Sequence, residues 1–164
     1  MIVRSEAPDD VAAIRAVEEV AFGQPAEAQL VDDLRAAGDS VFSLVAVDDG
    51  TVVGHALFSR MKAPFPALAL ALGPVAVLPE YRRTGFGSRL IRQGIARSET
   101  AGWQGIFVFG DPAFYRRFGF DAGKASDFIS PYAGPHLMAL PLARNELPTS
   151  TGSIQHAPAF AKLG

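Results

Sequence analysis

The sequence predicts an α/β protein of the mixed α+β kind, in which helices flank a mixed, mostly antiparallel sheet. Three observations predict this class. Helix-like and strand-like segments are interleaved along the chain, and a short acidic turn ending in glycine joins two strand-like segments as in an antiparallel hairpin. An apolar strand also leads through a glycine turn into a helix and then into a second buried strand, which is typical of a sheet with helices on its faces.

The first third of the chain predicts one strand and two helices. Pro8, Asp9 and Asp10 supply turn and helix-start chemistry, and apolar residues then recur at helical spacing. Gly38 is a natural stop for the second helix. We therefore expect a strand at Ile2 to Arg4 and helices from about Asp9 to Ala21 and from about Ala26 to Ala37.

The middle of the chain predicts four strands and a helix. Asp48-Asp49-Gly50 is a hairpin signal between two apolar runs, and Gly102 ends the helix. The expected strands are Val41 to Val47, Thr51 to Arg60, Ala67 to Val77 and Ile106 to Phe109, with a helix at Phe86 to Ala101 before the last of them.

The last third is rich in proline and glycine and predicts fewer elements. We expect a short helix from about Pro112 to Arg117, a strand beginning at Phe118-Gly119-Phe120 and a strand near Leu137 to Leu142. The rest of residues 121–164 has no pattern that assigns it.

Length and composition predict a single globular domain over residues 1–164. The chain has 164 residues, the size of one ordinary domain, and its 49% hydrophobic and 20% charged residues exclude a disordered chain. No apolar run approaches the roughly 18 uncharged residues of a membrane-spanning helix. Glu6, Asp9 and Asp10 stand where a signal peptide would be apolar. We expect a cytoplasmic protein with no membrane partner.

The residue types exclude several kinds of site. There is no cysteine, which removes disulfides, thiolate metal ligands and cysteine nucleophiles. The three histidines are far apart in sequence, so no metal cofactor is expected. A net charge of −2 gives no basic field for nucleic acid.

Charge is unevenly distributed along the chain. Residues 1–49 carry eleven acids and three arginines, a local net charge of −8, whereas residues 82–117 carry seven arginines and two acids, a local net charge of +5. Solvated helix faces of biased charge are one explanation. An anion site in the basic half is the other, and it is favoured by the glycine turn there.

That turn has the spacing of a phosphate-binding loop. Gly85 and Gly87 allow a tight turn at the start of a helix, whose unpaired amides favour an anion, and Arg82 and Arg83 add positive charge. The mononucleotide loop needs a lysine before Ser88, and the dinucleotide loop needs a third glycine three residues after Gly87; both are missing. A nucleotide-binding protein of another kind is therefore disfavoured. The spacing that fits is Arg/Gln-x-x-Gly-x-Gly/Ala.

With this loop the chain resembles the GNAT superfamily of N-acetyltransferases. The order of predicted elements is similar from end to end, and Tyr115-Arg116-Arg117-Phe118-Gly119-Phe120 has the Tyr-x-x-x-Gly-Phe ending of that superfamily. The segments 110–115 and 152–160 resemble a bacterial subgroup of predicted N-acetyltransferases of unknown substrate. The resemblance implies the acyl-CoA N-acyltransferase fold, with a sheet splayed between its fourth and fifth strands.

The resemblance also implies where coenzyme A would bind. Gly73 and Pro74 interrupt an otherwise central strand, where relatives splay the sheet and pair the pantetheine arm with the backbone; the alternative is that these residues end an edge strand. Phe86 is expected to contact the cofactor through its backbone only, with its ring in the core. The residues implied for the cofactor are Val75, Ala76, Val77, Arg82, Arg83, Thr84, Gly85, Phe86, Gly87, Ser88 and Phe114.

The catalytic residues are implied less completely. Tyr115 aligns with the tyrosine that many relatives use to protonate the departing thiolate; an amphipathic aromatic packing beside Phe114 is the alternative. Many relatives carry a glutamate base on the fourth strand, but residues 67–77 contain no acid. Glu27 and His55 are the candidate bases, with a solvated helix residue and a buried strand histidine as the respective alternatives.

Two functions follow as expectations. The first is an N-acetyltransferase that moves the acetyl group of acetyl-CoA to a primary amine by direct attack. Its acceptor would be a small amine or the lysine or N-terminus of a peptide, and the acidic first 49 residues favour a cationic one. The second is a non-catalytic module that binds acyl-CoA as a sensor or regulatory subunit. Either would act as a monomer or a homodimer.

Overall fold

The structure, a computed structural model, describes residues 1–64, 68–142 and 146–163. They form two compact units. Unit 1 comprises residues 1–59, 73–94 and 158–164, and unit 2 comprises residues 60–72 and 95–157. Three elements pass from one unit into the other: β3 (Thr51–Lys62), β4 (Ala69–Val77) and α3 (Phe86–Thr100).

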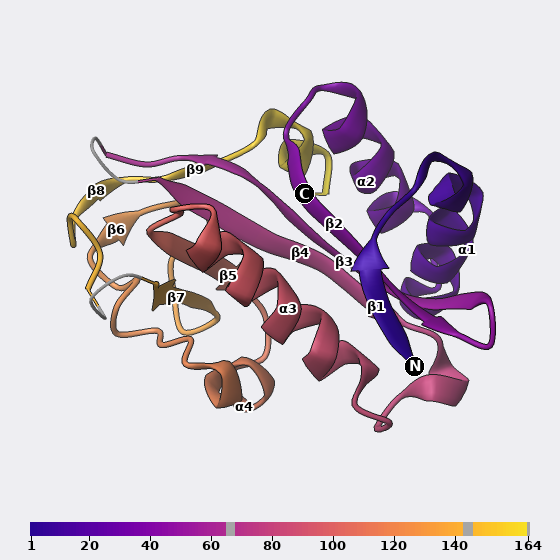
Figure 1. The fold of residues 1–164 in the computed structure, drawn as a ribbon. Coiled ribbons are helices and arrows are strands. Elements are labelled where there is room, and N and C mark those ends of the chain that lie inside the picture. The colour runs from indigo at the N-terminus through magenta and orange to yellow at the C-terminus, as the bar shows by residue number, and fades with distance from the viewer. Residues whose placement is uncertain (65–67, 143–145, 164) are drawn as a thin grey trace. The chain divides into compact units, whose positions relative to one another are not determined.

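Unit 1 is built on four strands in the order β1-β2-β3-β4 (Figure 1). β1 (Ile2–Ser5) and β2 (Ser40–Asp48) pair antiparallel, as do β2 and β3. The β2–β3 hairpin turns at Asp49 and Gly50, whose φ angles of 49° and 78° are those of a two-residue hairpin turn. The hairpin prediction is confirmed.

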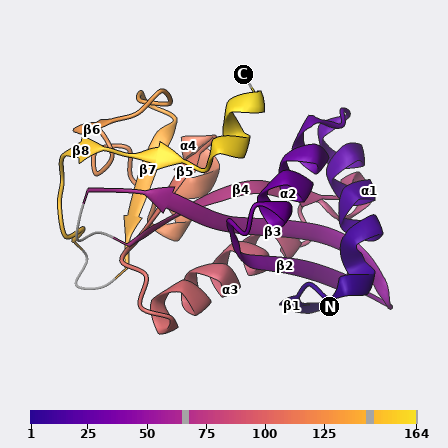
Figure 2. The ribbon, with the colours of Figure 1, turned by 90° about the horizontal axis from the view of Figure 1, so that it is seen from above.

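Helices cover both faces of this part of the sheet. α1 (Val11–Phe22) and α2 (Ala26–Ala36) lie side by side (Figure 2), and a 3₁₀ turn, η1 (Pro8–Asp10), precedes α1. His55 of β3 contacts Glu18 of α1, whereas its neighbour Gly54 lies against Leu90 of α3. Because adjacent strand residues point to opposite faces, α3 lies on the face away from α1. A last 3₁₀ segment, η4 (Pro158–Leu163), packs on α2.

Unit 2 continues the sheet with the order β4-β5-β7. β5 (Gly105–Phe109) runs parallel to β4, because α3 carries the chain back across the sheet between them, and β7 (Leu137–Pro141) is antiparallel to β5. Two-residue strands complete the unit: β6 (Phe128–Ile129) pairs with β8 (Gly152–Ser153), and β9 (Gln155–His156) pairs with the end of β3. Its core contains Ala69, Phe107, Ala125, Phe128, Leu137, Ala139 and Ile154.

The predicted fold class is confirmed by this mixed sheet with flanking helices. The strand predicted from Ala67 is observed from Ala69, and Ala67 itself lies outside the described residues. β4 continues through Gly73 and Pro74 to Val77, so these two residues do not end an edge strand. The pairing of β4 with β5 stops just before them, at Leu72 and Val108.

One predicted element is wrong. No strand begins at Phe118-Gly119-Phe120, because α4 (Pro112–Tyr115) continues into a 3₁₀ turn, η3 (Arg116–Phe118), and Gly119 ends it with a φ of 98°. Phe118 and Phe120 are both buried, but they lie in a helical turn and in coil rather than in a strand. Only the next residue, Asp121, forms a bridge, to Ala139 of β7.

Candidate functional site

The glycine turn predicted to bind phosphate lies between β4 and α3 in unit 1. A 3₁₀ turn, η2 (Pro79–Tyr81), follows β4, and the backbone then takes positive φ angles at Arg83 (64°) and Gly85 (89°). The Arg89 amide donates to the Gly85 carbonyl at 3.0 Å. The preceding amides of Phe86, Gly87 and Ser88 have no acceptor within the helix, so the start of α3 presents donors and a positive dipole end to an anion.

Apolar contacts hold this turn in place. Phe86 is buried, and its ring meets Tyr81 edge to face with centroids 5.7 Å apart. The Thr84 hydroxyl donates to the Tyr81 carbonyl. A Cβ placed on Gly87 would lie 3.6 Å from Val77 of β4. The Phe86 ring is therefore a core anchor, as predicted, and the backbone of the turn remains at the surface.

The two arginines of the turn differ in their surroundings. The Arg82 guanidinium donates to the carbonyl of Ala21 at the end of α1 (3.1 Å) and, more weakly, to the carbonyl of Val77 (3.4 Å). These bonds tie the turn to two neighbouring elements. Arg83 is exposed, and no carboxylate of the described chain forms an ion pair with it. Arg83 is therefore the arginine more readily available to a ligand.

The second half of β4 has an edge suited to an extended ligand. The Leu78 amide donates to Val53 of β3 at 2.9 Å. Because backbone donors alternate along a strand, the Ala76 amide faces β3, while the amides of Val75 and Val77 face the opposite edge. The β4–β5 register ends before them, at Leu72. Val75 and Val77 are half-buried, and the Ala76 side chain is buried.

Tyr115 lies in unit 2, at the end of α4. Asp111 caps that helix by accepting a hydrogen bond from the Ala113 amide at 3.0 Å. The Tyr115 ring packs on the backbone of Gly110, where a Cβ would lie 2.5 Å from Cε2. Burial raises the pKa of Tyr115 to about 12, so its phenol stays protonated at neutral pH.

Aromatic side chains surround Tyr115. Phe114 meets it edge to face at 5.0 Å between centroids, and Phe120 does so at 5.9 Å. Phe114 also packs against Phe118, and Arg117 stacks over the Phe114 ring at 4.8 Å. This packing fixes the direction of the phenol.

His55 is fully buried in unit 1 within a chain of hydrogen bonds. Its Nδ1 lies 2.6 Å from Glu18 Oε2, and its Nε2 lies 2.8 Å from the Ser43 hydroxyl. Ser43 donates to Glu6, whose carboxylate also pairs with Arg35 of α2. The hydroxyl has one proton, so it accepts from His55, and Nε2 therefore carries a hydrogen.

The carboxylates of this chain of hydrogen bonds have opposite pKa shifts. Burial raises the pKa of Glu18, and the nearby charge of Glu27 adds to the effect, although the bond to His55 opposes it. Burial also acts to raise the pKa of Glu6, but hydrogen bonds from Arg35 and Ser43 outweigh it and leave that pKa lowered. The protonated form is therefore favoured for Glu18, and the carboxylate form is favoured for Glu6.

Glu27 lies in the first turn of α2 and is half-buried. It accepts two hydrogen bonds from Gln24, at 3.0 and 3.1 Å. Glu18 was not predicted from the sequence, although it is fully buried and bonded to His55. Its position four residues after the buried Ile14, on the apolar face of α1, was the signal that could have identified it.

The acidic N-terminal region is largely neutralised within unit 1. Six of its eleven acids are in ion pairs, counting the pair of Glu18 with His55. The six are Glu6, Asp10, Glu18, Glu19, Asp32 and Asp33. Much of the local negative charge is thus structural.

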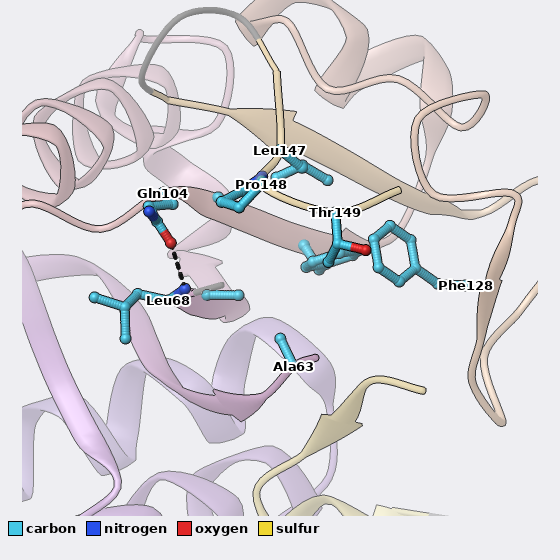
Figure 3. A pocket seen from close by; sticks show the side chains of 10 residues that line it. Ala63, Leu68, Gln104, Phe128, Leu147, Pro148 and Thr149 are labelled. Carbon is cyan, nitrogen blue, oxygen red and sulfur yellow. Dashed lines mark hydrogen bonds between the residues drawn. The ribbon is translucent and has the colours of Figure 1, made fainter. Parts of the chain in front are cut away.

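Unit 2 contains a small apolar pocket beside the start of β5 (Figure 3). Gln104 closes one side by accepting a hydrogen bond from the Leu68 amide at 2.8 Å, and Phe128 and Leu147 line it. It has room for about one water molecule, too little for a substrate. Within residues 1–64, 68–142 and 146–163, no group of acids and histidines could hold a metal ion, and no helix is long and apolar enough to cross a bilayer.

Comparison with known proteins finds that this chain is similar to one family. The sequence model of the acetyltransferase (GNAT) family matches residues 11–120. The uncharacterized N-acetyltransferase YhbS of Escherichia coli is 33% identical over 167 aligned positions, covering 99% of this chain and all of YhbS. The uncharacterized N-acetyltransferase YjhQ of the same species is 42% identical and covers 77% of this chain and 73% of YjhQ.

Solved structures agree in fold over nearly the whole chain. A crystal structure of E. coli YhbS in complex with CoA superposes with a TM-score of 0.92 at 32% identity and covers 99% of this chain and 93% of that one. A GNAT acetyltransferase from Brucella melitensis in complex with acetyl-CoA superposes with a TM-score of 0.82 at 36% identity, covering 97% of each chain.

Proposed function

The chain belongs to the acetyltransferase (GNAT) family, and on that premise we propose that it is an acetyl-CoA-dependent N-acetyltransferase acting on a primary amine by direct attack. The observation that carries this proposal is the turn at the start of α3. Its positive φ angles and unpaired helix amides make an anion site, and two solved relatives hold CoA or acetyl-CoA.

The residues of unit 1 fit the two polar parts of coenzyme A. The amides of Gly85 to Ser88 and the guanidinium of Arg83 suit a diphosphate, because they offer several donors and a positive charge at one helix end. The outward amides of Val75 and Val77 suit the amide groups of pantetheine, as in the addition of a strand. Arg82 would position the turn through its bonds to α1 and β4.

Acetyl-CoA supplies an acyl group activated as a thioester. The Val75 amide would donate a hydrogen bond to the acetyl carbonyl, where negative charge develops. Tyr115 would donate its phenol hydrogen to the leaving sulfur. With a pKa of about 12, the phenol is a weaker acid than a simple thiol by about 3.5 pKa units. Full transfer of its proton to the thiolate therefore costs about 5 kcal/mol, unless the phenol receives another proton in the same step.

Glu27 and His55 were the bases expected from the sequence, and their surroundings differ. Both ring nitrogens of His55 are bonded, and the side chain is buried, so it could receive a proton only through Glu18 or Ser43. Glu27 is half-buried and accepts only from Gln24. Of these two, Glu27 is the more accessible to an acceptor.

The acceptor is proposed to be a small amine or the lysine or N-terminus of a peptide. A cationic acceptor is supported by the five N-terminal acids outside ion pairs, which are Asp9, Glu27, Asp39, Asp48 and Asp49. A panel of amines of positive, zero and negative net charge would test this preference. Faster turnover of acidic acceptors would contradict it.

Two measurements test the function itself. Isothermal titration should show binding of CoA, and thiol release from acetyl-CoA should depend on an amine of the panel. Absence of CoA binding at millimolar concentration would overturn the proposal. Tight binding without thiol release for any amine would instead favour the acyl-CoA sensor, whose support is the lack of an acid along β4 (Ala69–Val77).

A further inference from the structure

We propose that His136 is the general base of the reaction and accepts a proton from the acceptor amine at Nε2. The inference rests on the proposed acetyltransferase function and deepens it. His136 is exposed and lies directly before β7 in unit 2, the unit that also contains Tyr115. A general base for the acceptor amine is not provided by β4, because that strand contains no acid.

Hydrogen bonding fixes the tautomer of His136. Its Nδ1 lies 3.1 Å from the carbonyl oxygen of Gly110. A carbonyl only accepts, so Nδ1 carries the hydrogen and, in the neutral ring, Nε2 carries the lone pair. The Gly110 amide also donates to the His136 carbonyl at 3.0 Å. Gly110 therefore forms hydrogen bonds with both the backbone and the imidazole ring of His136. This arrangement orients a basic nitrogen away from the protein backbone.

Gly110 is a neighbour of both His136 and Tyr115. The Tyr115 ring packs on the Gly110 α-carbon, so the proposed acid and the proposed base contact the same residue at the end of β5. A side chain at position 110 would collide with the Tyr115 ring, because a Cβ would lie 2.5 Å from it. Glycine at position 110 therefore leaves room for the Tyr115 ring next to the carbonyl that orients His136.

The surface beside His136 suits an amine that must lose a proton. The ring of Phe109 lies 6.0 Å from the imidazole and is 54% exposed, and Tyr132 lies 5.4 Å from Phe109. Apolar rings weaken the hydration of an ammonium ion and so favour the neutral amine. In the described chain no carboxylate forms an ion pair with His136, so none competes for its Nε2.

The other histidines are less suited to the role. His55 is buried with both ring nitrogens bonded. Burial lowers the pKa of His156 to about 4, which makes it a weak base at neutral pH. His136 alone among the three is exposed and oriented by a backbone carbonyl.

The proton balance of the step is complete. One proton passes from the ammonium to Nε2 of His136, and the neutral nitrogen forms the C–N bond to the acetyl carbon. The C–S bond breaks, and the second proton of the nitrogen reaches the sulfur through the Tyr115 hydroxyl. The imidazolium then releases its proton to solvent. The products are an amide, free CoA thiol and one proton.

The substitution His136→Asn tests the proposal because it separates the base from the structural bond. The asparagine amide can still donate to the Gly110 carbonyl from the position of Nδ1, but it has no basic nitrogen. With the best amine of the panel, we expect kcat/KM to fall by about 10² to 10⁴-fold. The Kd of CoA should stay unchanged. Asp127→Asn, a change at an exposed residue of unit 2, is the control and should keep wild-type kinetics.

A second variant guards against misfolding of the first. His136→Ala leaves a space at the surface, and added imidazole should restore at least tenfold of the lost rate if the missing group is a base. Wild-type kinetics in His136→Asn would overturn the inference alone, as would a loss of CoA affinity that parallels the loss of rate. A wild-type protein that releases no thiol would overturn the proposed function and this inference with it.

Discussion

The same substitution two residues apart in the cofactor turn should have opposite outcomes. Gly85 has a φ of 89°, which an L-residue adopts only with strain, and a Cβ there would meet no atom within 4 Å. Gly87 has no such φ, and its Cβ would make an ordinary 3.6 Å contact with Val77. Gly85→Ala therefore isolates backbone strain, and Gly87→Ala is its matched control.

The magnitude of the effect follows from the backbone conformation. An alanine in the left-handed region costs roughly 1–2 kcal/mol. If the turn keeps its shape in the free protein, this cost appears in the free energy of unfolding and lowers Tm by about 2–8 °C for a chain of this size. If the turn relaxes, binding must restore it, and the Kd of CoA rises by about 5 to 30-fold. Gly87→Ala should change neither quantity unfavourably, because alanine also suits the first turn of a helix.

Thermal unfolding followed by circular dichroism and isothermal titration with CoA measure the two quantities on the same samples. The sum of the two free-energy losses for Gly85→Ala should be about 1–2 kcal/mol, however it is divided. The reasoning is refuted if Gly85→Ala leaves both quantities unchanged, or if Gly87→Ala weakens CoA binding as much as Gly85→Ala does.

Three further predictions concern the acid, the core and the pH dependence. Tyr115→Phe should lower kcat by about 10² to 10⁴-fold and leave the Kd of CoA unchanged. Thiol release measures kcat, and isothermal titration with CoA measures the Kd. An unchanged kcat would show that Tyr115 acts only in packing. Gly94→Ala should lower Tm in thermal unfolding, because its Cβ would lie 2.0 Å from the buried Phe58 ring. Such overpacking costs about 1–3 kcal/mol, whereas replacing glycine by alanine within a helix stabilises it by at most about 1 kcal/mol. A Tm equal to or above wild type would contradict this. Because burial lowers the pKa of His156 to about 4, the unfolded chain takes up that proton first, and stability should fall by up to about 3 kcal/mol as pH falls from 6.5 to 4. Urea unfolding of wild type and His156→Gln at pH 7 and 4.5 isolates this contribution, and identical pH dependence in the two proteins would disprove it.

Local chemistry explains which elements could be predicted. Turn residues act over a few positions, so the hairpin at Asp49 and Gly50 was predicted correctly. The two-residue strands β6, β8 and β9 are too short to carry a periodic pattern and had no prediction. The strand expected at Phe118 failed because Gly119 ends a 3₁₀ turn there.

The sequence by itself predicted the turn that we propose for the cofactor, because a phosphate loop is a contiguous set of backbone positions with glycines at fixed spacing. It also indicated Tyr115 through a second contiguous motif. Only the tertiary structure could decide which polar residues meet across the fold. Glu18 and His55 are 37 residues apart, and Gly110 and His136 are 26 apart, so no spacing rule joins either pair. The turn proposed for the acetyl donor is local in the chain, whereas the proposed proton acceptor is oriented by a contact that only folding creates.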